Sequence, residues 1–323
     1  MKRAVRDAGE LYRRLQLDPN APALSEYLEL SQQGEKEFPV FVPLEFLDRM
    51  KAGDPRDPLL LQVLPRKEES IIDPGFVRDP VGDSNVEEAP GLLHKYHGRV
   101  LLILSGACAI HCRYCFRRHY PYATAPKNLD HWRAALEYIR GDTTIQEVIL
   151  SGGDPLMVAD EQLSRLIDQL ETIPHLTRLR IHSRLPVVIP QRINSDLCDW
   201  LSRTRFSTWM VLHINHSQEL DVPLVEAIGM LQRTGTMVLN QAVLLRDVND
   251  NVAELKRLCE RLVNCGVIPY YLHQLDRVTG ATHFEVEKAR GIELMTELAT
   301  QLPGYAVPRY VSEIAGEPNK TIL

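Results

Sequence analysis

The chain of 323 residues has few cysteines, no excess of basic residues and no long apolar segment. Six cysteines are too few for a disulfide-rich secreted scaffold, and no apolar run approaches the ~20 residues of a membrane-spanning helix. Its 37 basic and 43 acidic residues give a net charge of -6, which argues against a general nucleic-acid binder. The basic start of the chain is not followed by the apolar segment of a signal peptide. We therefore expect a cytoplasmic enzyme with reduced thiols that binds neither membrane nor nucleic acid.

Half of the cysteines lie within eight residues, at Cys108, Cys112 and Cys115, directly after the apolar run 100–104. Three thiolates can hold three irons of a four-iron cluster and leave the fourth iron open for chemistry. Neighbouring positive charge favours thiolates over thiols. The loop supplies it through Arg113, Arg117 and Arg118. The spacing therefore predicts an iron–sulfur cluster with one open iron.

A structural zinc site is the alternative for this loop, because His111 would complete a Cys3His set. Zinc sites usually combine two separated pairs of ligands, whereas all four of these residues lie on one loop. The remaining cysteines, Cys198, Cys259 and Cys265, match no metal-binding spacing, and we expect packed thiols there.

Apolar, β-branched runs alternate with amphipathic helical patterns through most of the chain, which predicts an α/β fold with a parallel sheet. The six expected strands are 100–104, 147–150, 179–182, 208–214, 237–245 and 267–272. Residues 1 to about 50 look helical and charged, and residues 54–90 carry six prolines, which suits an extended wrapping segment. The expected division is an extension over 1–95, a core over 96–285 and a C-terminal helix and segment over 286–323.

The second expected strand is followed by Ser151, Gly152, Gly153 and Asp154. Glycines at such a position let the backbone approach a ligand closely. An ordinary strand-to-helix turn would explain the two glycines equally well.

Together, the C-x3-C-x2-C loop and this turn resemble radical S-adenosylmethionine (SAM) enzymes, whose fold is a partial (β/α)6 barrel with its site at the carboxyl ends of the strands. The resemblance implies that Cys108, Cys112 and Cys115 hold a 4Fe-4S cluster and that the open iron chelates SAM. It also implies that the segment from Ser151 to Asp154 binds the methionine part of SAM.

From residue 92 onward the chain is similar to the lysine 2,3-aminomutase family. The similar runs are HKYH at 94–97, RYCFRR at 113–118, SGGDPL at 151–156, RLPVVIPQR at 184–192, HINH at 213–216, NQAVLLRDVN at 240–249 and GATHF at 280–284. These runs are long and occur in the same order as in the family.

The resemblance implies a second cofactor, pyridoxal 5'-phosphate (PLP), bound as a Schiff base by Lys320 in the run 311–320. Without the resemblance, Lys320 would be a solvated lysine near a frayed end. Lys95 and Arg99 align with two phosphate-binding arginines, and a lysine at 95 keeps the charge but loses the bidentate fork. The simpler interpretation is that these two basic residues are exposed to solvent where the chain enters the first strand.

Substrate-binding residues follow from the same resemblance. Arg117 aligns with an arginine that binds the substrate carboxylate, and its planar fork suits that group. Asp276 and Glu313 align with two acids that bind the distal ammonium of lysine, Glu313 standing where the family usually has aspartate. Taken alone, each acid would more often be a surface or salt-bridge residue.

Polar residues at or near the ends of the middle strands are candidates for contact with SAM or PLP. The principal ones are His213, Asn215 and Gln241. His216, Asn240, Ser183 and Arg184 occupy similar positions, and any one of these could instead be a satisfied core residue.

The resemblance implies isomerisation of L-lysine to β-lysine by 2,3-amino migration, with an external electron donor such as a flavodoxin or ferredoxin. The short C-terminus resembles the bacterial branch that makes (R)-β-lysine for modification of elongation factor P, which would link the chain to that factor and its β-lysine ligase. The alternatives are a 2,3-aminomutase of another amino acid and a radical SAM enzyme that modifies RNA or protein.

Overall fold

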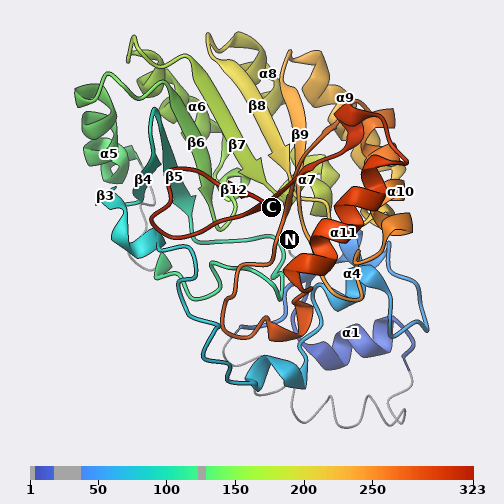
Figure 1. The fold of residues 1–323 in the computed structure, drawn as a ribbon. Helices are drawn as coiled ribbons and strands as arrows, with labels where there is room; N and C mark the ends of the chain where they lie inside the picture. The colour runs from blue at the N-terminus through green and yellow to red at the C-terminus, as the bar shows by residue number, and fades with distance from the viewer. Residues whose placement is uncertain (1–3, 18–37, 123–128) are drawn as a thin grey trace.

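The computed structural model describes residues 4–17, 38–122 and 129–323. It contains a ten-stranded sheet in the order β12-β11-β10-β9-β8-β7-β6-β5-β4-β3 (Figure 1). The strands from β5 to β11 run parallel and comprise Arg99–Ser105, Glu147–Gly152, Arg178–Ser183, Ser207–Leu212, Met237–Val243, Ile268–His273 and Arg309–Ser312. Six of them match the predicted strands, which confirms the predicted α/β partial barrel.

Both edges of the sheet carry antiparallel strands that the sequence patterns did not predict. At one edge lie β3 (Glu87–Ala89) and β4 (Leu92–Tyr96), and at the other lies β12 (Thr321–Ile322), which pairs with β11. β3 and β12 have only three and two residues, and β4 is apolar only at Leu92, Leu93 and Tyr96, so no regular pattern marks them. The two sheet edges are made by residues 87–96 and 321–322.

Helices cover the outer face of the parallel strands (Figure 1). They are α5 (Leu129–Gly141), α6 (Asp160–Glu171), α7 (Leu185–Val188), α8 (Ser195–Arg203), α9 (Val222–Arg233), α10 (Val252–Asn264) and α11 (Lys288–Ala299). Several begin at a side chain that accepts a backbone N–H of the first turn, as Asn194, Asp221 and Asn251 do. These caps fix where each strand-to-helix connection ends.

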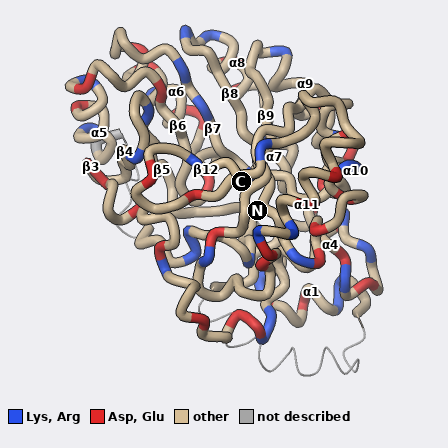
Figure 2. Tube along the Cα trace, in the orientation of Figure 1, with Lys and Arg blue, Asp and Glu red and all other residues tan. Residues whose placement is uncertain are grey.

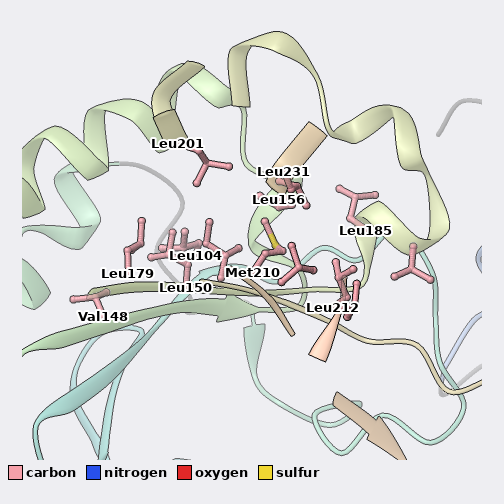
Figure 3. Packing of buried hydrophobic residues seen from close by; sticks show 14 of the residues in the cluster. Leu104, Val148, Leu150, Leu156, Leu179, Leu185, Leu201, Met210, Leu212 and Leu231 are labelled. Carbon is pink, nitrogen blue, oxygen red and sulfur yellow. The ribbon is translucent and has the colours of Figure 1, made fainter. Parts of the chain in front are cut away.

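The main hydrophobic core lies between the sheet and these helices (Figure 3). Leu150, Leu179 and Met210 from the strands are buried with Leu201 and Leu231 from the helices. Because side chains alternate along a strand, the intervening residues face the other side of the sheet. That inner side carries the cavity described below.

The N-terminal extension forms a smaller apolar cluster beneath the sheet, where α1 (Ala8–Arg14) and α4 (Pro58–Leu61) appear at the lower end of Figure 1. Residues 1–50 are not uniformly helical as predicted, because β1 (Ala4–Val5) pairs with β2 (Val42–Pro43), ahead of the short helix α3 (Leu44–Leu47). Proline and β-branched valine favour this extended backbone. Residues 18–37 of that prediction lie outside the described residues.

Residues 54–90 wrap around the sheet through single turns, including the 3-10 turns η1 (Lys67–Ser70) and η2 (Asp83–Asn85). Basic and acidic residues are interspersed along the chain (Figure 2). Within the described ranges, no helix is both long and apolar enough to cross a membrane.

Candidate active site

A cavity of about 530 Å³ opens at the carboxyl ends of the parallel strands. It brings together nearly all of the residues that the sequence singled out. Its lining includes Cys108, Cys112, Cys115, Ser151, Gly152, Gly153, Asp154, His213, Gln241, Lys95, Arg99, Arg117, Asp276, Glu313 and Lys320. Residues far apart in the sequence therefore share one enclosed space.

The three loop cysteines line this cavity, whereas His111 does not. The His111 ring stacks on Phe38, and its Nδ1 lies 2.7 Å from the carbonyl oxygen of Pro39. In the part of the chain that the structure describes, no three Cys, His, Asp or Glu side chains converge as the ligands of a single metal ion would. The arrangement suits three corners of a larger cluster rather than a Cys3His zinc site.

The thiols of Cys108 and Cys115 are neutral without a metal, contrary to the thiolates that the basic loop predicts. Burial and the neighbouring Cys112 raise the pKa of Cys115 to about 11, and burial also raises the pKa of Cys108 well above its ordinary value. Bound iron supplies the positive charge that stabilises thiolates in such a place. The loop therefore fits a cationic cluster.

An ion-pair cluster anchors the cysteine loop to the N-terminal extension. Arg113 is fully buried, and its Nε and Nη2 donate to the two carboxylate oxygens of Glu69 at 2.7 and 2.5 Å. Arg118 donates to the same carboxylate at 2.9 Å. The extension thus fixes the residues between and beyond the cysteines.

The glycine turn after β6 packs directly against the cysteine loop. The N–H groups of Gly153 and Asp154 donate to the carbonyls of Ser105 and Ala107. A Cβ at Gly153 would lie 2.6 Å from the Ala107 oxygen, so only glycine fits. The turn therefore places a ligand-accessible backbone beside the cysteines.

Asp154 is buried and connects the turns after β6 and β7. Its carboxylate accepts from the Ser183 hydroxyl and from the backbone N–H of Arg184 and Leu185. Its hydrogen bonds are thus made within the protein, although the residue lines the cavity.

Arg184 reaches the cluster loop from the end of β7. Its Nη1 lies 2.6 Å from both the Cys112 sulfur and the Tyr114 hydroxyl, and its Nη2 lies 3.1 Å from the buried carboxylate of Glu219. Burial alone would lower the pKa of Arg184, but its contacts with Cys112, Tyr114 and Glu219 raise it, so the guanidinium is charged. A fixed positive charge therefore lies beside one of the three loop cysteines.

Three of the predicted strand-end candidates lie behind the cavity wall. The fully buried Asn215 donates to the Tyr114 hydroxyl at 2.7 Å and accepts from the backbone of Val243. Asn240 pairs with the backbone of Ile214, and His216 contacts Glu254. Asn215 and Asn240 connect neighbouring strands and His216 contacts helix α10, whereas His213 and Gln241 line the cavity.

Side chains of alternating positive and negative charge form one wall of the cavity. In order, they are Arg117, Asp83, Lys95, Glu313 and Lys320. Arg117 Nε lies 2.7 Å from Asp83, and Lys95 Nζ lies 3.3 Å from Asp83 and 2.8 Å from Glu313. Lys320 Nζ pairs with the other Glu313 oxygen. Nothing in the local sequence around Asp83 indicates this role, because its partners are 12 and 34 residues away.

The two acids predicted to bind ammonium differ in protonation. Burial and the neighbouring Glu313 raise the pKa of Asp276 to about 7. Burial alone would raise the pKa of Glu313 as well, but the ammonium groups of Lys320 and Lys95 hold it below its usual range. Asp276 is therefore largely protonated below about pH 7, whereas Glu313 is ionised between two ammonium groups.

Sequence reasoning missed several polar residues on the inner face of the sheet, among them Arg180, His182 and His273. Burial and nearby cations lower the pKa of both histidines, to about 3 for His273, so both rings are neutral. The alternation of polar and apolar residues in β7 was the signal that could have identified Arg180 and His182.

A family model described as a 4Fe-4S single cluster domain matches residues 97–178. Among solved structures, a radical SAM methyltransferase from Sphaerobacter thermophilus gives a TM-score of 0.49 at 19% identity, over 68% of each chain. Coproporphyrinogen III oxidase of Escherichia coli gives 0.41 at 11% identity, over 70% of this chain and 54% of that one. The cysteine loop, the glycine turn and the partial barrel together define a radical SAM enzyme, which holds a 4Fe-4S cluster and binds SAM.

Three relatives named L-lysine 2,3-aminomutase match almost the whole chain. The one from Escherichia coli K12 is 49% identical over 99% of this chain and 92% of its own length. Those from Haemophilus influenzae and Buchnera aphidicola are 45% and 43% identical, over 100% and 99% of this chain and 94% and 93% of their own lengths. The chain belongs to the L-lysine 2,3-aminomutase family of isomerases.

Proposed function

We propose that this enzyme converts L-lysine into β-lysine by 2,3-amino migration, using PLP together with the cluster and SAM. The observation that carries the proposal is the opposite charge offered within one cavity. Arg117 offers a guanidinium for a carboxylate, and Asp276 and Glu313 offer carboxylates for an ammonium group. The names of the relatives support lysine as the amino acid.

The guanidinium of Arg117 is positioned to bind a carboxylate by two contacts with the protein. Its Nε is bound to Asp83 and its Nη1 to the Ser151 hydroxyl at 3.2 Å. Burial by itself lowers the pKa of Arg117, but Asp83 outweighs burial and raises it, which keeps the guanidinium charged. A glutamate side chain would bring a third carboxylate toward Asp276 and Glu313, which disfavours a glutamate aminomutase.

The described residues also fit PLP. Lys320 would hold it covalently, and Lys95 and Arg99 would bind its phosphate, since all three line the cavity. When bound, the reduced cluster and SAM supply a deoxyadenosyl radical that removes hydrogen from carbon 3, while PLP carries the migrating nitrogen. The protein orients these groups and excludes water from the radical.

The decisive test is turnover by anaerobically reconstituted enzyme with SAM, PLP and a chemical reductant. Lysine should be converted to β-lysine, measured by chromatography of derivatised amino acids. Norleucine, which lacks the distal ammonium, should react at least about a hundredfold more slowly, because unmatched buried carboxylates cost on the order of 3 kcal/mol. Equal rates for the two amino acids would remove lysine as the substrate while leaving an aminomutase.

The covalent role of Lys320 has its own test. Borohydride reduction of the PLP-loaded enzyme should attach a pyridoxyl group to Lys320, identified by peptide mass spectrometry. Lys320→Ala should lose the label and keep its iron, whereas replacement of the exposed Lys288 by alanine should change neither. A label on another lysine peptide would show that the assignment is wrong.

We further propose the R enantiomer as product, reduction of the cluster by a flavodoxin or ferredoxin, and use of the product to modify elongation factor P. The similarity to the bacterial relatives supports these proposals. Chiral chromatography tests the enantiomer, and turnover with each purified donor tests the reductant. Intact-mass measurement of elongation factor P from cells with and without this enzyme tests the pathway.

A further inference from the structure

Glu313 lies between two ammonium groups in the cavity. Its Oε1 is 2.8 Å from Lys95 Nζ, and its Oε2 pairs with Lys320 Nζ. The side chains of Lys95, Glu313 and Lys320 are only 11, 16 and 19% exposed, so water screens these pairs weakly. Both oxygens of the acid expected to bind the substrate ammonium are therefore already engaged.

The pairing of Glu313 with Lys320 follows from backbone register. Strands β11 and β12 are antiparallel, with Ser312 opposite Thr321 and Val311 opposite Ile322. The next two residues toward the connecting loop are Glu313 and Lys320, which extends the same register by one step. Their side chains meet because the hairpin places them opposite each other.

A further ammonium group would approach a carboxylate whose oxygens both face positive charge. It would have to share oxygens that already accept from Lys95 and Lys320, and it would be repelled by both ammonium groups. Asp276 alone is a poor substitute, because it is largely protonated below about pH 7. The site for the substrate ammonium is thus closed while Lys320 carries its charge.

We infer that the second oxygen of Glu313 binds two cations in turn, the Lys320 ammonium before PLP is loaded and the ammonium of the amino acid afterwards. This inference rests on the proposed function. When Lys320 reacts with PLP, its ammonium gives a proton to solvent, its nitrogen bonds to the aldehyde carbon, and the aldehyde oxygen leaves as water. Glu313 Oε2 then no longer faces the Lys320 ammonium, so loading of PLP precedes and permits tight binding of lysine.

The test is equilibrium dialysis of radiolabelled lysine against protein that carries the cluster and SAM but no PLP. Wild-type protein should bind lysine weakly. Lys320→Met removes the competing ammonium and should bind lysine about tenfold more tightly or better. Lys320→Arg keeps a cation beside Glu313 and should remain as weak as wild type.

Two controls connect the gain to Glu313 and to the substrate ammonium. The double variant Lys320→Met/Glu313→Gln should lose the gain, and norleucine should bind the wild type and Lys320→Met equally. Iron content and near-UV circular dichroism identify any variant that fails to fold. If Lys320→Met binds lysine no more tightly than the wild type, or if the double variant shows an equal gain in lysine affinity, the proposed exchange of cations on Glu313 is wrong.

The outcomes also separate this inference from the proposed function. If the wild type with PLP makes β-lysine but Lys320→Met binds lysine no better without PLP, the exchange is wrong and the proposed function stands. If the fully loaded wild type makes no β-lysine, the proposed function fails. The dialysis result still reports whether Lys320 blocks Glu313 in that case.

Discussion

Glu69 and Arg113 form a two-point ion pair between the N-terminal extension and the cysteine loop, with N–O distances of 2.7 and 2.5 Å. Both side chains are buried, and Arg118 shares the Glu69 carboxylate. Removing one partner of such a pair leaves an uncompensated buried charge. The extension is therefore a structural part of the cluster site.

Glu69→Gln should lower the free energy of unfolding by about 3 to 5 kcal/mol and reduce the iron bound after reconstitution, because Arg113 loses its counterion. Urea unfolding and iron analysis measure the two effects. Glu137→Gln breaks the exposed pair with Arg133 and should cost less than about 1 kcal/mol. Wild-type iron content and stability in Glu69→Gln would show that the loop does not depend on the extension.

Replacing Cys108, Cys112 or Cys115 by alanine should abolish SAM cleavage and reduce bound iron from about four per chain, because each thiolate holds one iron. Cys198→Ala should leave both unchanged, since Cys198 lies in α8 and does not line the cavity. Iron analysis and chromatography of deoxyadenosine give the result. Stoichiometric zinc with full activity in air would contradict the cluster.

Lysine binding should strengthen by roughly tenfold between about pH 6 and about pH 8, because Asp276 must lose its proton to accept the substrate ammonium. Its pKa is raised from 3.8 to about 7 by burial and Glu313. The stability that Asp276 contributes when protonated is correspondingly lost as pH rises through about 7. Asp276→Asn should flatten both profiles, measured by binding and by urea unfolding. An unchanged profile for lysine binding would assign the titration to another group.

Arg184→Gln should make the cluster harder to reduce, because the guanidinium beside Cys112 favours the extra electron. We expect the midpoint potential to fall by roughly 60 mV, a tenfold change in a one-electron equilibrium. Electron paramagnetic resonance during a redox titration without SAM measures it, with exposed Arg133→Gln as control. A potential equal to that of the wild type would mean that Arg184 serves only the Tyr114 and Glu219 contacts.

The parallel strands could be predicted from the sequence because they are long apolar runs with regular spacing. The predicted strand 100–104 corresponds to β5 (Arg99–Ser105), and the predicted strand 179–182 corresponds to β7 (Arg178–Ser183). The strands β11 and β12 could not be predicted in this way, since β11 begins with Arg309 and ends with Ser312 and β12 has only two residues. Their pairing depends on tertiary contacts that no local pattern encodes.

Motifs and family resemblance marked residues that the fold brings to one cavity, as for the three cysteines and Lys320, whose roles stay predictions. The resemblance could not tell that Asn215 faces Tyr114 rather than the cavity, because a strand-end position fixes the backbone but not the direction of every side chain. Asp83 was missed because its role arises from Arg117 and Lys95, which approach only in the folded chain.

Lys95 and Glu313 are neighbours in space but are 218 residues apart along the chain. Contacts between such distant segments form only after most of the entropy of ordering the intervening chain has been lost. The cavity is consequently a late product of folding, completed when β11 joins a sheet that already holds β5 to β10. A chain synthesised faster than it can fold would expose the inner face of this parallel sheet and tend to aggregate before it could take up either cofactor.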